Sequence, residues 1–380
     1  MLLVSCLLYT SVFTISTILF KFSEYLKKKQ AVVFRFIALL MLCVLAGLRE
    51  STIGTDTAGY LKPLITYAIN SNNFSDYWNS SWIVSLWKTN FTYQYEPGFT
   101  IFIYIVARTT CSVIFTQTLL QFLVIFPVYK AIKKQGSIPL WFGMLIFDCL
   151  LFNHSLNMIR QSVAMSFVLL SFIYWTEGLK KKAVVLIVLA TSFHLCGVIG
   201  LLIIFLYDFV VKDYKNGKKN KILRNRNFNI ALMVGITLVL IANIIANILS
   251  QFGITRFLMY ISGAVTIMPN QIIVRALGLI LFLYNFKKIS KNTNQESYFY
   301  LLMILYEILV SQFAGVNEYS LRIAQMFTVF DTISYPMACK YSKYKRVNTI
   351  LMIMYLIFYW YFYFVLAGTA QTIPYEMINL

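Results

Sequence analysis

Residues 32–48 read VVFRFIALLMLCVLAGL, an apolar run in which Arg35 is the only charged residue. A helix of about 20 residues crosses the ~30 Å hydrocarbon core of a bilayer. Similar runs recur along the chain, and we interpret them as membrane spans near 2–20, 32–48, 111–129, 138–153, 157–176, 228–249, 271–286, 298–314, 320–338 and 347–366. The apolar run 182–211 is longer, so it predicts two short helices that meet at Phe193 and His194. The expected fold is an all-α, polytopic integral membrane protein with about 12 transmembrane helices.

Composition excludes a water-soluble protein. Of the 380 residues, 59% are hydrophobic and only 12% are charged, whereas about 25% are charged in an ordinary soluble domain. Lys and Arg number 33 against 14 Asp and Glu, for a net charge of +19. That excess would suggest a nucleic-acid partner in a soluble protein, but in a membrane protein the location of the charge matters more. We expect one polytopic domain over 1–380, with a large outer loop at about 49–97 and no nucleic-acid partner.

Most basic residues lie in clusters that fall on alternate loops, at 21–35, 130–134, 180–182, 212–226, 287–291 and 340–346. The positive-inside rule places these loops in the cytoplasm and both termini outside. No basic residue precedes the first apolar run, which favours a retained helix over a cleaved signal peptide. Segment 98–110 is also apolar, but counting it as a span would put the later clusters on the wrong side. We therefore predict that it is re-entrant or interfacial.

The remaining basic residues lie on or near the outer face and are mostly arginines: Arg49, Lys62, Lys88, Arg108, Arg160, Arg256, Arg275 and Arg322. Guanidinium groups hold phosphate or carboxylate bidentately, whereas Lys-rich clusters suit anionic headgroups. This distribution favours an anionic ligand on the outer face. The alternative is that arginine is simply common at helix ends.

The outer loop opens with GLRESTIGTDTAGY at 47–60 and closes with YEPGF at 95–99. It is rich in Trp and Tyr, which is typical either of a membrane-interface belt or of stacking on sugar rings. Asp56 and Glu96 are its candidate acids. Each also has a purely structural interpretation, Asp56 as the N-cap of a helix at 57–69 and Glu96 as the start of the helix that Pro97 opens.

The next outer turn reads NHSLNMIRQ at 153–161. Asn157, Arg160 and Gln161 have the spacing i, i+3, i+4, so one helical face would present an amide, a guanidinium and a second amide to an anion. Amides at the start of the span would assist. The alternative is a capped helix start whose arginine reaches toward the interface.

His194, Arg275 and Arg322 extend this outer constellation, with His194 at the tip of a short helical pair. Two histidines are too few for a His-rich metal site, so we expect metal-independent chemistry and no cofactor. The acids inside the expected spans are few and scattered: Asp148, Glu307 and Asp331. A proton-coupled transporter would instead place paired charges at the membrane midplane.

These motifs, in this order, resemble a known family. GLR (47–49), GTDTAGY (54–60), EPGF (96–99), SLNMIRQ (155–161), FH (193–194), an arginine near the start of a late span and IPYE (373–376) resemble the EpsG branch of Wzy-type polysaccharide polymerases. The resemblance spans nearly the whole chain.

The resemblance implies a bacterial inner-membrane glycosyltransferase of GT-C-like architecture. Such an enzyme polymerises repeat units linked to undecaprenyl pyrophosphate on the outer face of the membrane, for O-antigen, capsule or exopolysaccharide. Its expected partners are the lipid-linked oligosaccharide, membrane lipid, a chain-length regulator and a flippase.

This chemistry needs a cationic clamp for the pyrophosphate and a base for the acceptor hydroxyl. The clamp candidates are Arg160, Arg322, Arg49 and Arg275, and Tyr60, Asn157 and Gln161 complete the proposed substrate-binding set. The base candidates are Glu96, Asp56 and His194, among which the sequence does not choose. Competing functions are a flippase or transporter of lipid-linked oligosaccharide, and a glycan ligase or acyltransferase.

Overall fold

The computed structural model describes residues 1–85, 88–212, 225–251, 267–293, 295–315 and 321–378. The chain is 83% helical and forms two compact units. Unit 1 comprises Met1–Gly200 and Ile357–Leu380, and unit 2 comprises Leu201–Leu356.

The long helices of unit 1 pack in series: α1 against α2, α2 against α6, α6 against α9, and α9 against α10. Apolar side chains such as Leu42, Val124 and Leu169 are fully buried between them. The helices of this unit are α1 (Leu2–Ser23), α2 (Lys28–Gly47), α3 (Lys62–Asn70), α4 (Phe74–Trp78), α5 (Pro97–Thr110), α6 (Val113–Gln135), α7 (Leu140–Phe147), α8 (Asn153–Asn157), α9 (Ile159–Thr176) and α10 (Lys180–Phe193). Short π-helical turns cover Thr57–Leu61, Asp148–Phe152 and Tyr361–Leu366, and 3-10 turns cover Thr92–Gln94, Leu195–Val198 and Thr369–Gln371.

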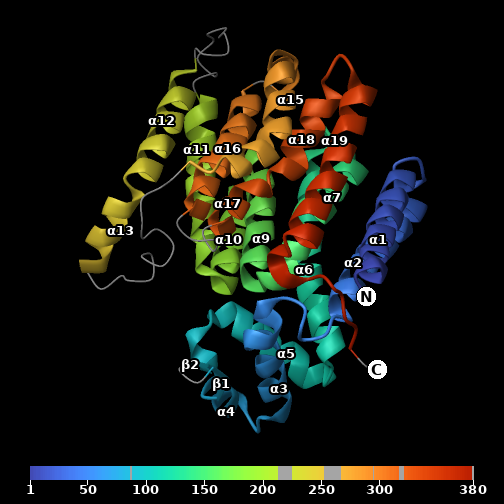
Figure 1. Cartoon of the computed structure of the whole chain (residues 1–380), viewed down its shortest axis with the longest axis vertical. Coiled ribbons are helices and arrows are strands. Elements are labelled where there is room, and N and C mark those ends of the chain that lie inside the picture. The colour runs from blue at the N-terminus through green and yellow to red at the C-terminus, as the bar shows by residue number, and fades with distance from the viewer. Residues whose placement is uncertain (86–87, 213–224, 252–266, 294, 316–320, 379–380) are drawn as a thin grey trace. The chain divides into compact units, whose positions relative to one another are not determined.

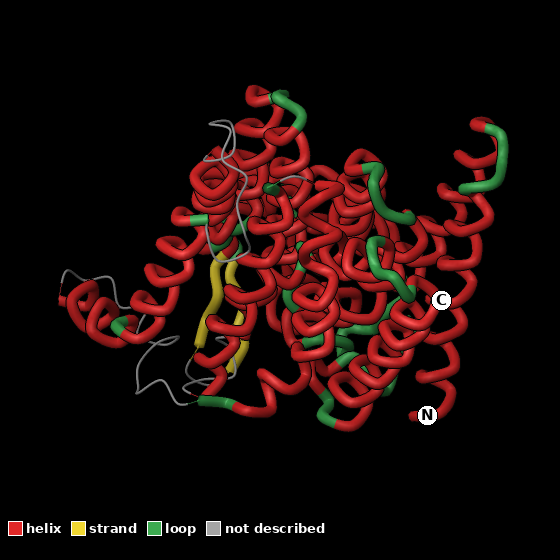
Figure 2. The backbone as a smooth tube through the Cα atoms, turned by 90° about the horizontal axis from the view of Figure 1, so that it is seen from above, coloured by secondary structure: helices red, strands yellow, loops and turns green. Residues whose placement is uncertain are grey.

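The outer loop of unit 1 is folded. Figure 1 shows α3, α4, α5 and a hairpin of β1 (Ser81–Ser85) and β2 (Lys88–Phe91) gathered at one end of the long helices of this unit. The strands are antiparallel, with Trp82 opposite Asn90, and they stand out in Figure 2 against the helices. The sequence did not predict this hairpin, because strands of five and four residues are too short to show a reliable alternating pattern.

Unit 2 is built around α16, which contacts α12, α15, α17 and α18. Its described helices are α11 (Ile199–Lys212, which begins at the end of unit 1), α12 (Arg226–Leu240), α13 (Ala242–Gln251), α15 (Pro269–Thr293), α16 (Glu296–Ser311), α17 (Leu321–Thr328), α18 (Asp331–Lys340) and α19 (Lys345–Trp360, which ends in unit 1). A 3-10 turn over Gln312–Gly315 follows α16. Arg256 and most of the basic cluster 212–226 lie outside the described residues.

The predicted class, an all-α membrane protein, is confirmed. Five described helices are long and apolar enough to cross a membrane: Leu2–Ser23, Lys28–Gly47, Val113–Gln135, Glu296–Ala314 and Lys345–Leu366. Other expected spans are interrupted. The run 138–153 passes through a π-helical turn into α8, and the described part of the run 320–338, which starts at Leu321, divides into α17 and α18. Hydropathy reports the length of an apolar run, but not where the helical hydrogen-bond register changes.

Two local predictions concern the helix break in 182–211 and the short segment 98–110. The break in 182–211 lies where it was predicted, because α10 ends at Phe193 and His194 is extended. Segment 98–110 forms α5, whose 14 residues measure roughly 21 Å and fall short of the ~30 Å bilayer core. Its re-entrant or interfacial location and the count of about 12 spans remain predictions.

Candidate functional site

The GTDT segment of the outer loop is docked on the turn that joins α8 and α9. Gly54 has φ +77°, and a Cβ atom there would lie 2.7 Å from the carbonyl oxygen of Leu156. Only glycine suits both the conformation and the close approach. The Thr55 hydroxyl then donates to Asn157 Oδ1 at 2.7 Å, and the Asp56 amide approaches the same oxygen at 3.4 Å. Two motifs separated by about a hundred residues in sequence are thereby joined.

The predicted continuous helical face over 157–161 is wrong. Asn157 ends α8, Met158 has non-helical dihedral angles (φ −107°, ψ 61°), and α9 begins at Ile159. The break leaves Arg160 and Gln161 in the first turn of a new helix, where backbone amides lack helical partners and the helix dipole is positive. The anion-binding character expected of this turn therefore rests on a helix start, and Asn157 serves to anchor the outer loop.

Arg160 is the centre of the site. Its Nη1 forms an ion pair with Glu96 Oε2, and both side chains are about one-fifth exposed, at 20% and 22%. The guanidinium lies 4.9 Å from the ring centre of Tyr60 and 4.8 Å from that of Tyr95, within the range of cation–π attraction. Its Nε is buried and has no hydrogen-bond partner among the described residues. Arg160 is thus held in place and retains a donor for a further acceptor.

Tyr60 connects Arg160 to the second candidate acid. Its hydroxyl donates to Asp56 Oδ2 at 2.5 Å. Burial and, after it, the Asp56 carboxylate raise the pKa of Tyr60 well above its ordinary value, so the phenol keeps its proton. Asp56 is the N-cap residue of the turn Thr57–Leu61, which continues into α3, as the structural interpretation expected, but its side chain makes no capping bond there.

The Tyr95 ring links Arg160 to the β1–β2 hairpin. Tyr95 stacks on Trp82 with ring centres 5.9 Å apart, and the Trp82 indole donates to the Gly59 carbonyl at 2.9 Å. Asn90, opposite Trp82 in the hairpin, donates to the Tyr95 hydroxyl at 2.8 Å. Burial raises the pKa of Tyr95 to about 12. The hairpin therefore fixes one of the two rings that hold Arg160.

Glu96 also does more than open a helix. It makes no side-chain capping bond to α5, and its Oε1 accepts the Leu195 amide at 3.3 Å. His194 is partly buried at this point, and its Nδ1 accepts the Cys196 amide at 3.2 Å. The tip of the helical pair over 182–211 thus meets the EPGF motif.

Arg49 is less exposed to solvent than the other candidate site residues of unit 1. It is 1% exposed and donates from Nη1 to the Ala46 carbonyl at 2.5 Å and from Nε toward Thr57 at 3.4 Å. Burial lowers its pKa to about 10. It also forms a β-bridge with Met377. This places Arg49 beneath the outer loop, next to the C-terminal segment.

The C-terminal IPYE motif is part of this support. Tyr375 donates to the Leu45 carbonyl at 2.5 Å, and the Glu376 carbonyl accepts the Glu50 amide at 2.9 Å. The motif contributes to the family resemblance, but the sequence alone assigns no role to its residues. Only the contacts show that the end of the chain holds the GLR segment.

The other two candidate arginines lie in unit 2. Arg275 on α15 is 5% exposed and forms an ion pair with Glu307 on α16. Arg322 lies in the first turn of α17 and is half-buried. Glu307 and Asp331 are scattered in the sequence, but α16 and α18 pack against each other and bring the two acids together.

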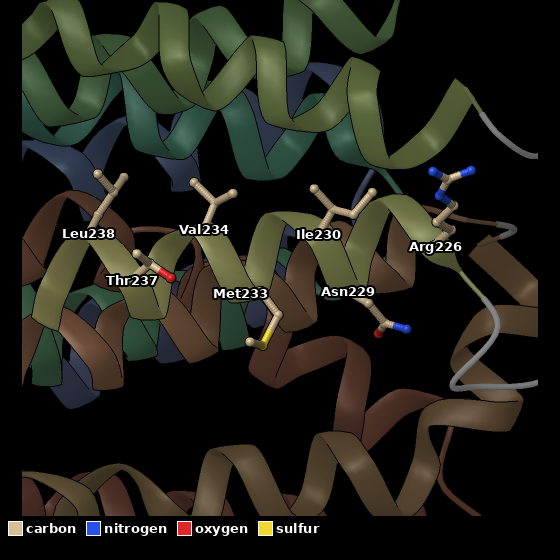
Figure 3. Close-up of a pocket in the computed structure, with 7 residues that line it drawn as sticks. All are labelled: Arg226, Asn229, Ile230, Met233, Val234, Thr237 and Leu238. Carbon is tan, nitrogen blue, oxygen red and sulfur yellow. The ribbon is translucent and has the colours of Figure 1, made fainter.

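The described residues also show what other kinds of site the chain offers. No three His, Cys, Asp or Glu side chains in that part of the chain gather as a metal would require. A hollow on α12 is lined by Arg226, Asn229, Ile230, Met233, Val234, Thr237 and Leu238, all from one helix (Figure 3). It contains no acid and no histidine, so it offers no groups for acid–base chemistry.

Comparison with known proteins agrees with the motif order. No curated protein and no solved structure matches this chain. The model of the EpsG family matches residues 32–377, which include every motif and site residue named above. The chain therefore belongs to the EpsG family, the family of Wzy-type polysaccharide polymerases.

Proposed function

We propose that this protein polymerises undecaprenyl-pyrophosphate-linked oligosaccharide repeat units on the outer face of the bacterial inner membrane. The growing glycan moves from its lipid carrier to a hydroxyl of an incoming unit, by glycosyl transfer that needs no metal. In this proposal the chain has about 12 spans in a GT-C-like arrangement, with both termini outside. Family membership supports the general role, and the finer assignments rest on the site in unit 1.

The observation that carries the proposal is the setting of Arg160. A guanidinium at a helix start, held against two neighbouring aromatic rings and with an Nε that has no partner among the described residues, suits a phosphate group. When the bond from the sugar C1 to the pyrophosphate oxygen breaks, negative charge develops on that oxygen. Arg160 and the first amides of α9 would stabilise this charge in a partly dehydrated site.

We assign the base to Glu96. The acceptor hydroxyl forms the new bond to C1 and must lose its proton, so a base has to lie within hydrogen-bonding reach of that hydroxyl. Glu96 shares the Arg160 guanidinium with which the pyrophosphate would pair. Pyrophosphate binding would weaken that ion pair and free Glu96 beside the reacting carbon. Asp56 then acts through Tyr60 as a positioning residue, and His194 shapes the loop that touches Glu96.

The test is the glycan ladder of a strain that lacks the gene, complemented with wild type or with Arg160→Ala at matched expression. A polymerase predicts a ladder with wild type and a single-repeat band with the variant. Arg108→Ala is the matched control, since the Arg108 guanidinium donates to carbonyls of the outer loop, away from Arg160, and it should keep the ladder. Accumulation of lipid-linked units facing the cytoplasm would instead show a flippase.

A further inference from the structure

Unit 2 contains a buried cluster of three ionisable side chains that the glycosyl transfer proposed for unit 1 does not use. Arg275, Glu307 and Asp331 come from α15, α16 and α18 and are 5%, 2% and 1% exposed. Charges at such burial are costly unless they are paired and hydrogen-bonded. The number of positive and negative charges in the cluster therefore indicates its protonation state.

Arg275 is satisfied by one carboxylate. Its Nε donates to Glu307 Oε1 at 2.6 Å, and its Nη1 donates to the carbonyl and the side-chain oxygen of Gln271 at 3.1 and 2.8 Å. One positive and one negative charge are thus matched. The second acid, Asp331, adds a negative charge for which the described contacts of the cluster supply no further cation.

Two oxygens of the cluster also lack donors. Glu307 Oε2 and Asp331 Oδ2 are buried without a hydrogen-bond partner among the described residues, while Ser334 donates to Asp331 Oδ1 at 3.1 Å. The two side chains nevertheless meet, because α16 and α18 pack against each other and the two acids interact directly. Two ionised carboxylates cannot bond, because neither has a hydrogen to donate. One proton would satisfy both groups and bring the net charge of the cluster to zero.

We propose that Glu307 and Asp331 form a proton-binding site inside unit 2, with one proton held between the two carboxyl groups. Arg275 keeps Glu307 ionised, and Asp331 carries the proton. Among the described residues, the other titratable groups that interact with the pair are phenols: Tyr335, which hydrogen-bonds Asp331, and Tyr355, whose hydroxyl donates to the Val274 carbonyl at 2.7 Å. Neither phenol supplies the missing positive charge.

Charge balance makes different predictions for each member of the cluster. In Asp331→Asn the protonated carboxyl is removed. In Glu307→Gln the only acid left in the cluster is Asp331, which must ionise to balance the charge of Arg275. The protonated carboxyl of Asp331 is therefore lost, although the substitution is at Glu307. In Arg275→Gln no cation remains, and both acids take up protons.

Infrared spectroscopy of the purified full-length protein in detergent at neutral pH measures this directly. The band is the C=O stretch of protonated carboxyl groups, identified by its shift in D2O. Relative to wild type, Asp331→Asn and Glu307→Gln should each lose the absorbance of one carboxyl, and Arg275→Gln should gain that of one. Asp148, the third acid in the expected spans, is unchanged in every sample and cancels in the difference spectra.

Asp76→Asn, at an exposed position of α4, is the matched control and should leave the band unaltered. Because the predicted changes have opposite signs, a variant that fails to fold leaves the others decisive. Equal bands in wild type, Asp331→Asn and Arg275→Gln would overturn the proposal. Thermal stabilisation of wild type by sodium chloride over choline chloride, lost in Asp331→Asn, would also overturn it, because the ligand would then be a sodium ion.

Discussion

Two arginine–carboxylate pairs, one in each unit, differ in how far they are removed from water. In unit 1 the side chains of Arg160 and Glu96 are 20% and 22% exposed, and aromatic rings lie against the guanidinium. In unit 2 those of Arg275 and Glu307 are 6% and 3% exposed, and a second acid adjoins them. A partly exposed pair can exchange its partner for a ligand at lower cost than a buried pair, which must stay neutral as a group. The difference separates a site suited to binding an anion from one suited to holding a proton.

The largest effect is expected when the buried arginine loses both of its acids. The double variant Glu307→Gln, Asp331→Asn leaves the Arg275 charge uncompensated, which should lower the free energy of unfolding by about 3–5 kcal/mol. Thermal unfolding in detergent measures this. Adding Arg275→Met should restore much of the loss. A double variant as stable as wild type would mean that Arg275 reaches water or another anion.

In unit 1 we expect the reverse pattern, a large effect on activity and a small one on stability. Arg160→Lys keeps the charge but loses the planar fork, so polymerisation should fall by about 100-fold. Its free energy of unfolding should change by no more than about 1 kcal/mol. The measurements are glycan-ladder formation and thermal unfolding of the same preparation. Arg108→Lys serves as the control, and full activity of Arg160→Lys would remove Arg160 from the leaving-group site.

The sequence alone predicts little of the difference between the Arg160 site of unit 1 and the Arg275 cluster of unit 2. Apolar runs and basic loops predicted the membrane class, and the motifs supplied most residues around Arg160. Local patterns do not report which distant segments meet. The break at Met158, the hairpin that fixes Tyr95 and the meeting of Glu307 with Asp331 all depend on tertiary packing. The same limit explains why the C-terminal contacts to the GLR segment went unrecognised.

A smaller effect should follow from loosening the aromatic support of Arg160. Tyr95→Leu removes a cation–π contact and the stacking on Trp82, which together should cost about 1–2 kcal/mol of unfolding free energy. Polymerisation should weaken because the guanidinium is less well positioned. Tyr95→Phe retains the ring and loses only the bond to Asn90, so it is the matched control. Equal behaviour of the two variants would show that the ring itself contributes nothing.

The smallest effect is expected at a third pair, Lys62 with Glu50, whose side chains are 52% and 30% exposed. Hydrogen bonds from the Ser51 amide and hydroxyl lower the pKa of Glu50 to about 2. Because the folded-state pKa is lowered, the stabilisation is complete above the ordinary value near 4.5 and is lost as the pH falls toward 2. Glu50→Gln should therefore be slightly less stable than wild type at pH 6, and the difference should shrink toward pH 2, as thermal unfolding at both pH values can measure. If the difference in stability between Glu50→Gln and wild type grows as the pH falls, the lowered pKa of Glu50 is contradicted. If that difference is as large as the loss expected at Arg275, the exposure of an ion pair does not determine its contribution to stability.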